Sequence, residues 1–410
     1  MGVTTAERGE VADLVLINTC TVTETASQKC RQMIHRMVRQ HPGAYVVVTG
    51  CYAQLDPDAV EQIPGVSLTL GANEKARLIQ FLSEAWGEKQ THVERHTKDI
   101  RSFAPSCSRG SRTRYFLKVQ DGCDYFCTYC AIPFARGFSR NPTIDSLVLQ
   151  AQQAVAEGGK EIVLTGVNIG DFGKTTGERF IDLVKALDTR VPGIARYRIS
   201  SLEPDLLTDD LIAYCAESPH FMPHFHIPLQ SGADEVLRLM HRHYDSRLFA
   251  DKVRRVVQLM PDAFIGVDVM VGCRGEREEL FRQTFDLLSD LPVAQLHVFP
   301  YSERPGTAAL RIPHTVSEAE KRERSHQLLA LSDEKLRAFY ARYRGTQAEV
   351  LFERAARGRA MHGFTRNYIR VELPAAEASP ALDNELRIVT LGDLNAKGDA
   401  LKTLEVKSEE

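Results

Sequence analysis

The chain has 410 residues, a formal net charge of −3 at pH 7, and 43% hydrophobic and 26% charged residues, which is the composition of a globular protein with two or three domains. No apolar run approaches the ~20 residues that span a membrane, and the amino terminus has no apolar signal core. We therefore expect a cytoplasmic protein without a membrane partner. The near-neutral net charge neither indicates nor excludes a nucleic-acid partner.

The amino-terminal part of the chain alternates strand-like and helix-like patterns, which predicts a small α/β domain over residues 1–86 with a parallel sheet covered by helices. Residues 87–112 lack periodicity and are rich in Lys, Arg, Ser and His, so they are predicted to be a linker. The strands are expected at residues 13–18 and 45–49, and the helices at residues 23–40 and 73–86.

The alternation resumes over residues 113–343. Six strand–helix units in one direction predict an incomplete (βα)6 barrel, smaller than the closed eight-unit form. The expected strands are residues 115–119, 161–165, 196–200, 224–227, 264–270 and 295–299, and the expected helices include residues 144–156, 180–187, 206–216, 277–289 and 316–343.

Residues 344–410 change character, with short β-like runs at 347–352 and 368–372 and glycines between them. This pattern predicts a small all-β barrel. The stretch from Arg342 to Arg370 holds seven Arg and two Glu, with Phe364 and Tyr368 between them. Arginines for phosphates and aromatic rings for stacking are typical of a nucleic-acid face. A solvated basic surface is the alternative interpretation.

The strongest motif is a crowded group of three of the nine cysteines. Cys123, Cys127 and Cys130 have the spacing C-x3-C-x2-C directly after a predicted strand. Each thiolate can ligate one iron of a four-iron cluster, which leaves one iron open for another ligand. Structural zinc is the alternative, but it needs a fourth nearby ligand. The next candidates are the distant Cys215 and His220, so the spacing favours the cluster.

This spacing, with an aromatic residue before the last cysteine, resembles the radical S-adenosylmethionine superfamily. The resemblance implies that Cys123, Cys127 and Cys130 are catalytic and hold a 4Fe-4S cluster. It also implies that S-adenosylmethionine binds the open iron and that Tyr129 contacts its adenine. One-electron transfer would then release a 5′-deoxyadenosyl radical, while the protein excludes water and aims the radical.

Nearly the whole chain resembles one branch of that superfamily, the methylthiotransferases. The resemblance implies an N-terminal domain with a second cluster, the radical core over residues 113–343, and an RNA-binding TRAM barrel over residues 344–410. Several of the matching strings are most similar to enzymes that act on threonylcarbamoyladenosine in tRNA. The matches are residues 17–23 (INTCTVT), 49–54 (TGCYAQ), 118–123 (KVQDGC), 132–137 (IPFARG), 164–168 (LTGVN), 200–204 (SSLEP), 224–232 (HFHIPLQSG) and 363–368 (GFTRNY).

The resemblance also implies ligands for the second 4Fe-4S cluster. Cys20 and Cys51 each follow a predicted strand, so they are expected to converge at one edge of the sheet. The family uses three cysteines, the first on an earlier strand, so this ligand set is incomplete. The chain is expected to begin about one strand–helix unit late. Cys30 lies in a helical pattern, and we interpret it as a packing residue that faces away from the strand-end loops.

Three further residues are candidates for contact with S-adenosylmethionine. Ser200 and Gln230 end strands at the face where barrel active sites form. Gly159 enters a strand where the family's backbone meets the methionine end of the cofactor, although a plain helix-to-strand turn explains this glycine equally well. His224 and His226 are interpreted as core histidines rather than catalytic groups.

The implied function is methylthiolation of threonylcarbamoyladenosine next to the tRNA anticodon, with the barrel holding the anticodon stem–loop. The electron donor and the sulfur donor are unidentified. The alternatives are the same chemistry on isopentenyladenosine or on a ribosomal protein aspartate, and an inactive RNA-binding remnant. We expect that removal of the barrel weakens tRNA binding and leaves S-adenosylmethionine cleavage largely intact.

Overall fold

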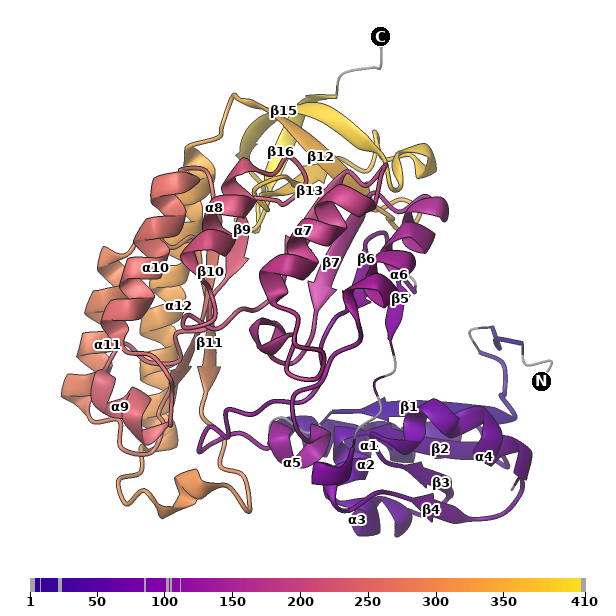
Figure 1. Cartoon of the computed structure of the whole chain (residues 1–410). Helices are drawn as coiled ribbons and strands as arrows, with labels where there is room; N and C mark the ends of the chain where they lie inside the picture. Colours follow the sequence, from indigo (N-terminus) through magenta and orange to yellow (C-terminus); the bar gives the residue numbers. More distant parts are fainter. Residues whose placement is uncertain are drawn as a thin grey trace. The chain divides into compact units, whose positions relative to one another are not determined.

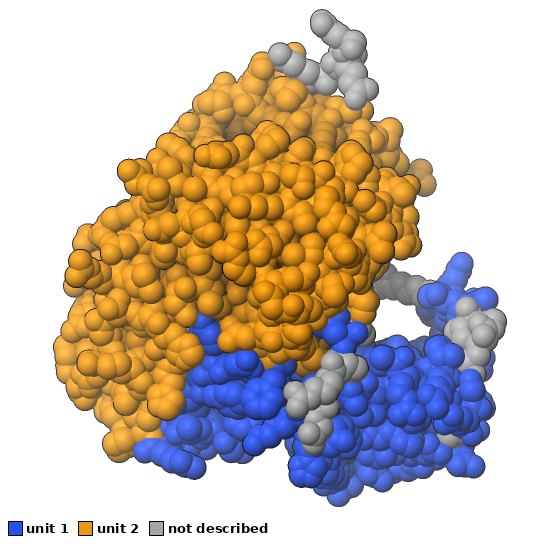
Figure 2. Space-filling model, viewed as in Figure 1, with its two compact units in different colours: residues 1–104, 122–138, 302–311 blue, residues 105–121, 139–301, 312–410 orange. Residues whose placement is uncertain are grey.

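The computed structural model describes residues 4–7, 9–20, 24–84, 86–100, 103, 105–110 and 112–406. The end of the motif at residues 17–23 therefore lies outside the described residues, as do parts of the predicted linker. The chain packs as two compact units, coloured separately in Figure 2. Unit 1 comprises residues 1–104, 122–138 and 302–311, and unit 2 comprises residues 105–121, 139–301 and 312–410. The cysteine-rich loop thus packs with the amino-terminal residues.

Unit 1 is built on a four-stranded parallel sheet with the order β1-β2-β3-β4. The central strand β2 is buried on both faces, as parallel sheets require. Val46 and Val48 pack with Ile34 on one face, and Val47 packs with Phe81 on the other. The elements are β1 (Leu14–Thr19), α1 (Glu24–Gln40), β2 (Tyr45–Gly50), α2 (Cys51–Leu55), α3 (Pro57–Glu61), β3 (Val66–Leu70), η1 (Glu74–Arg77), α4 (Leu78–Glu84), β4 (Gln90–His92) and η2 (Thr97–Asp99).

The α/β prediction for this region is confirmed, with additions. The strand β3 was not expected, and the predicted linker contributes two short strands, β4 and β5 (Ser106–Ser108). These two strands have three residues each and polar sequences, so hydrophobic periodicity cannot reveal them.

Unit 2 contains six parallel strands with helices between them, which confirms the incomplete (βα)6 barrel (Figure 1). Bridges between Tyr197 and Phe221 and between Ser201 and His226 join the β5–β8 sheet to the β9–β11 sheet. The elements are β6 (Tyr115–Lys118), α6 (Ile144–Ala156), β7 (Glu161–Thr165), η3 (Ile169–Asp171), α7 (Phe180–Arg190), β8 (Arg196–Ile199), α8 (Asp209–Glu217), β9 (His224–His226), α9 (Asp234–Leu239), α10 (Ser246–Leu259), β10 (Phe264–Val271), α11 (Glu278–Asp290), β11 (Gln295–Pro300) and α12 (Glu318–Ala341).

The carboxyl-terminal residues form a closed five-stranded barrel, which confirms the all-β prediction. Its core is continuous with the rest of unit 2, because Phe264, Leu336 and Phe339 belong to the same buried cluster as the barrel residues Phe352 and Val371. The strands are β12 (Gln347–Glu353), β13 (Met361–Thr365), β14 (Arg370–Leu373), β15 (Leu386–Leu394) and β16 (Leu401–Val406), with η5 (Pro380–Leu382) before β15.

A buried charge cluster joins the barrel to the amino ends of β7 and β8. Glu161 is fully buried and pairs with Arg198 at 2.8 Å, with Arg114 at 3.7 Å and with Arg196 at 3.8 Å. Burial pushes the pKa of Glu161 upward, but the three guanidinium charges hold the pKa below its ordinary value. Arg198 also donates to the backbone carbonyl of Thr365 at 2.7 Å. The barrel is therefore an integral part of unit 2.

The same junction accounts for two aromatic residues expected to stack on RNA bases. The rings of Phe364 and Tyr368 stack on each other with centroids 4.7 Å apart. Arg114 lies 4.8 Å from the Phe364 centroid and Arg198 4.9 Å from the Tyr368 centroid, while His224 covers Tyr368 at 4.1 Å. Both rings are half-buried and contact other side chains of the protein, so part of their surface is already occupied, and the base-stacking role expected for them stays a prediction.

Candidate functional site

The cysteine-rich loop is closed at its base by two glycines. Gly122 has φ 75°, and a Cβ there would lie 2.0 Å from the Phe138 carbonyl oxygen. Gly137 has φ 73° and accepts a hydrogen bond from the Cys123 amide at 3.1 Å. Only glycine allows this conformation together with so close an approach. The loop is therefore a compact segment followed by α5 (Ile132–Arg136).

The three cysteines of this loop differ in burial. Cys127 is buried, and Cys123 and Cys130 are half-buried. The Ile132 amide lies 3.4 Å from the Cys130 sulfur, in the position of the hydrogen bonds that tune cluster thiolates. Among the described residues, no three His, Cys, Asp or Glu side chains surround one metal position. A four-iron cluster instead places one thiolate on each of three irons.

Aromatic side chains flank the loop. Phe126 has φ 49°, unusual for a bulky residue, and leaves 41% of its surface exposed. Its ring makes edge contacts with Phe134 at 6.1 Å and with Phe138 at 6.0 Å. Tyr129, predicted to contact adenine, is half-buried in the same loop. These rings place apolar side chains beside the loop, and Phe126, Phe134 and Phe138 remain exposed to solvent.

Cys20 and Cys51 converge as expected. In the parallel register of β1 and β2, Thr19 pairs with Gly50, and each cysteine follows directly after these partners. Cys30, however, does not face away from this edge. Its sulfur donates to the Cys20 carbonyl at 3.1 Å and lies 3.4 Å from the Cys20 amide. The orientation expected for Cys30 is wrong because α1 returns this residue to the strand end, although Cys30 also packs against the hydrophobic core.

A side chain links the cysteine-rich loop to Cys51, and a cavity lies beside the residues that follow Cys51 and Cys130. Arg136, the last residue of α5, places Nε 3.3 Å from the Cys51 sulfur. A cavity of about 360 Å³ is bordered by Tyr52 and by Ala131, which directly follow Cys51 and Cys130. The cavity has the size of a small-ligand site. Its other lining residues are Ser27, Arg31, Leu55, Asp56, Phe134 and residues 304–307.

Two cofactor candidates in unit 2 lie at the carboxyl ends of neighbouring strands. Ser200 follows β8, and its amide donates to the Leu164 carbonyl at 3.2 Å. Gln230 follows β9 and has φ 65°, a strained conformation for this residue. Backbone hydrogen bonds to the Asp268 carbonyl and from the Met270 amide, both 2.9 Å, hold it there. The structure thus places both residues at the end where barrel active sites form.

The third candidate, Gly159, lies elsewhere. It precedes β7, at the amino end of the strands, and a Cβ there would meet the Tyr115 ring at 2.8 Å and the Ala154 carbonyl at 2.7 Å. The turn from α6 into β7 and this close packing explain the glycine. Its position does not support the cofactor contact expected for Gly159.

The (βα)6 barrel contains acidic groups that the sequence analysis did not single out. Burial, together with the charges of Asp205 and Asp268, raises the pKa of Glu203 to about 7 against the opposing effect of Arg242, with which Glu203 forms an ion pair. Asp268 also contacts the Nε2 atom of His226 at 2.7 Å. In the sequence, Asp268 stands out only as an acidic residue within the apolar strand of residues 264–271.

The two histidines of β9 differ in environment. His224 is packed against Tyr368, and burial, together with the nearby Arg198 charge, lowers its pKa well below the ordinary value. It is a neutral core histidine, as interpreted from the sequence. His226 stacks on His297 with ring centroids 5.0 Å apart and contacts a carboxylate.

Comparison with known proteins agrees with this geometry. Residues 117–288 match the Radical SAM superfamily, and residues 1–71 match the Uncharacterized protein family UPF0004. The chain is 37% identical to the threonylcarbamoyladenosine tRNA methylthiotransferase MtaB of Bacillus subtilis, over 97% of this chain and 90% of the relative. The chain belongs to the radical S-adenosylmethionine methylthiotransferase family.

Other members of the methylthiotransferase family are similar over most of the chain. The MtaB protein of Aquifex aeolicus is 35% identical over 83% of this chain and 84% of its own length. The tRNA-2-methylthio-N(6)-dimethylallyladenosine synthase of Bifidobacterium longum is 35% identical over 83% of this chain and 71% of its own.

A solved structure supports the fold assignment. The radical S-adenosylmethionine methyltransferase TsrM from Kitasatospora setae, with cobalamin and a 4Fe-4S cluster bound, superposes with a TM-score of 0.54. It is 16% identical and covers 73% of this chain and 66% of its own. No helix among the described residues is long and apolar enough to cross a membrane.

Proposed function

We propose that this chain is a tRNA methylthiotransferase that converts N6-threonylcarbamoyladenosine next to the anticodon to its 2-methylthio derivative. The observation that carries this proposal is the 37% identity to the Bacillus subtilis MtaB protein over 97% of the chain. The overall reaction replaces the hydrogen at adenine C2 with a methylthio group. One S-adenosylmethionine supplies the methyl group, and another supplies the radical that removes the hydrogen.

The core cofactor site is assigned to the loop of unit 1. Cys123, Cys127 and Cys130 would hold a 4Fe-4S cluster. When bound, this cluster supplies the electron that cleaves S-adenosylmethionine. Tyr129 of the same loop is proposed to contact S-adenosylmethionine, and the cofactor contacts expected for Ser200 and Gln230 stay predictions from the sequence. The exposed rings of Phe126, Phe134 and Phe138 form an apolar surface beside the loop, on which a bound substrate could exclude water from the radical chemistry.

The sulfur-bearing site is assigned to the edge of the first sheet. Cys20 and Cys51 would be ligands of a second 4Fe-4S cluster, and this pair is an incomplete set for a cluster that takes three thiolates. Cys30, whose sulfur contacts the Cys20 backbone, lies at the same edge. Arg136 donates toward the Cys51 sulfur and would orient it. The cavity beside Tyr52 and Ala131 is proposed to receive the target adenine, because these two lining residues directly follow Cys51 and Cys130.

The RNA partner is proposed to be the anticodon stem–loop of tRNA, held by the β12–β16 barrel. Arginines on its surface would contact phosphates, so binding is expected to be sensitive to salt. A tRNA substrate supports a cytoplasmic location for the enzyme.

The test is nucleoside mass spectrometry of tRNA from a strain that lacks this gene. The strain should lose the 2-methylthio form of threonylcarbamoyladenosine, and the wild-type gene should restore it while Cys127→Ala should not. Loss of 2-methylthio-isopentenyladenosine instead would show that isopentenyladenosine is the substrate. Unchanged tRNA nucleosides would contradict the proposal.

A further inference from the structure

Two arginines line the cavity beside Tyr52 and Ala131. Arg304 is only 8% exposed, and its Nη1 atom lies 3.3 Å from the Ser27 hydroxyl. Arg31, on α1, lies over the Tyr52 ring at 5.9 Å. The acidic lining residue is Asp56, and its carboxylate accepts from the Ala59 amide at the start of α3. The cavity therefore carries more positive than negative charge.

The modified adenosines that the named relatives act on differ in charge at N6. A threonylcarbamoyl group ends in a carboxylate, whereas a dimethylallyl group is a hydrocarbon. The planar guanidinium group of arginine can donate two parallel hydrogen bonds to one carboxylate. Such pairs strengthen where water is scarce, which is the environment of the buried Arg304.

We propose that Arg304, together with Arg31, binds the carboxylate of the threonylcarbamoyl group and selects this substrate over adenosines with apolar N6 groups. The inference rests on the proposed function and adds the residues that determine specificity. A site built around a charged partner rejects an analogue without that partner, because its own buried polar groups then stay unpaired.

The test measures the affinity of the anaerobically reconstituted protein for three anticodon stem–loop RNAs of one sequence, with threonylcarbamoyladenosine, isopentenyladenosine or unmodified adenosine at the target position. Wild type should bind the threonylcarbamoyl RNA about 10-fold more tightly than the other two. Arg304→Gln should remove this preference and leave the affinity for unmodified RNA unchanged, which also shows that the variant is folded. Arg31→Gln should reduce the preference in part.

The matched control is Arg95→Gln, because Arg95 pairs with Asp58 on the surface of unit 1 and does not line the cavity. The control should keep the wild-type preference. A wild-type preference that survives in Arg304→Gln would overturn the inference. Equal wild-type affinity for all three RNAs would also overturn it, and nucleoside analysis would then decide separately whether threonylcarbamoyladenosine is the substrate.

A second inference rests on the arginines of the barrel. Of the seven arginines between residues 342 and 370, most are engaged within the protein, which the sequence could not indicate. Arg357 and Arg359 are exposed and have no ion pair among the described residues. The engaged residues are Arg342 with the Pro261 carbonyl, Arg344 with Asp393, Arg354 with Asp383, Arg366 with the Pro219 carbonyl, and Arg370 with Asp399.

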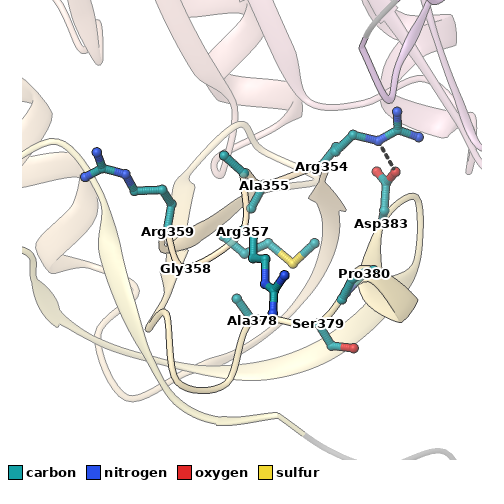
Figure 3. A pocket seen from close by; sticks show the side chains of 11 residues that line it. Arg354, Ala355, Arg357, Gly358, Arg359, Ala378, Ser379, Pro380 and Asp383 are labelled. Carbon is teal, nitrogen blue, oxygen red and sulfur yellow. Dashed lines mark hydrogen bonds and ion pairs between the residues drawn. The ribbon is translucent and has the colours of Figure 1, made fainter.

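Arg357 and Arg359 flank the tip of the turn between β12 and β13. The Arg359 amide donates to the Ala356 carbonyl at 3.0 Å, which closes a tight turn. Gly358, the third residue of this turn, has φ 72°, a conformation that glycine adopts readily. A cavity of about 580 Å³ lies beside this turn. In Figure 3 the Arg357 side chain extends over the cavity toward Ala378 and Ser379, whereas Arg359 points to the other side of the turn.

The geometry points to an RNA-backbone site at this turn. Arg357 and Arg359 contact successive phosphates, and the floor formed by Ala355, Ala378 and Pro380 accepts an unstacked nucleotide. Two unpaired cations beside an apolar hollow suit a looped or single-stranded segment, in which the bases are free of a helix. This inference rests on tRNA as the partner.

The test compares wild type with the double variant Arg357→Gln/Arg359→Gln in titrations with the unmodified stem–loop RNA at several salt concentrations. Each lost phosphate contact lowers the slope of log K against log salt by about 0.7–0.9, so the double variant should lose about 1–2. The control is Arg344→Gln/Arg370→Gln, which removes two paired arginines and should change the slope less.

An unchanged slope in Arg357→Gln/Arg359→Gln would overturn the inference. Polyglutamate that displaces the bound RNA as well as unlabelled RNA does would also overturn it, since the site would then be a surface for acidic polypeptides. A wild-type protein that binds no RNA would contradict the proposed function itself.

Discussion

Arg136 Nε lies 3.3 Å from the sulfur of Cys51. Arg136 ends the short helix that follows Cys123, Cys127 and Cys130, and Cys51 begins the helix that follows β2. One guanidinium group therefore connects the proposed radical site to the proposed sulfur site within unit 1. Residue types and spacing indicated both sites, but nothing in the sequence indicated their contact.

The first prediction concerns this contact. Arg136→Ala removes the donor to Cys51, and partners that orient metal ligands contribute about 10-fold or more to metal affinity. We expect iron at the Cys20 and Cys51 site to fall while 5′-deoxyadenosine formation stays near wild type. Iron analysis with electron paramagnetic resonance checks this, and Arg136→Lys should recover part of the iron. Equal loss of both clusters would contradict a role confined to Cys51.

The second prediction concerns the core cluster. Cys127→Ala should remove about four irons per chain and abolish 5′-deoxyadenosine formation, because the loss of one thiolate leaves an iron of the cluster without its protein ligand. Cys123→Ala and Cys130→Ala should do the same. Cys107→Ala is the control, since Cys107 lies on β5 outside the loop. Activity retained in Cys127→Ala, or zinc bound in place of iron, would exclude the radical mechanism.

Sequence patterns predicted the architecture well where apolar periodicity was strong. The strand β7 and the helix α6 have the expected bounds, and the other core strands differ from prediction by one residue at an end. The patterns could not reveal that the barrel shares a buried charge cluster with β7 and β8, because Glu161, Arg196 and Arg198 look like surface residues in a linear sequence. The expectation that the barrel can be removed cleanly is therefore not supported.

The candidate site was predictable only in part. Thiolate chemistry and spacing predicted Cys123, Cys127 and Cys130 as cluster ligands, and the structure places all three in one compact loop. Glu203 and Arg304 were missed, because their role depends on burial and on neighbours far along the chain. Gly159 was a false candidate, since a glycine needed for close packing has the same sequence appearance as one needed for ligand approach.

The third prediction tests the charge cluster. Glu161→Gln leaves Arg196 and Arg198 buried without their carboxylate, which costs about 3–5 kcal/mol for a broken buried pair. We expect a clearly lower Tm in thermal denaturation. Glu385→Gln breaks the partly exposed pair with Lys160 and should cost about 0–1 kcal/mol. Equal effects of the two substitutions would show that the cluster does not stabilise the barrel junction.

The fourth prediction uses the pKa of Glu203, which burial raises from 4.5 to about 7. Between these values the folded protein binds a proton that the unfolded chain does not, so the contribution of Glu203 to stability declines as the pH rises through this range. Glu203→Gln keeps an uncharged side chain at every pH. The Tm of the variant minus the Tm of wild type should therefore rise from pH 5 to pH 8. The lost pairing with Arg242 changes this difference by a constant amount but does not change its trend. Differential scanning calorimetry at each pH measures this trend.

The control for the Glu203 prediction is Glu217→Gln on α8, where the side chain is exposed, and it should show no trend. A flat difference for Glu203→Gln would mean that Arg242 keeps the carboxylate ionised over the whole range.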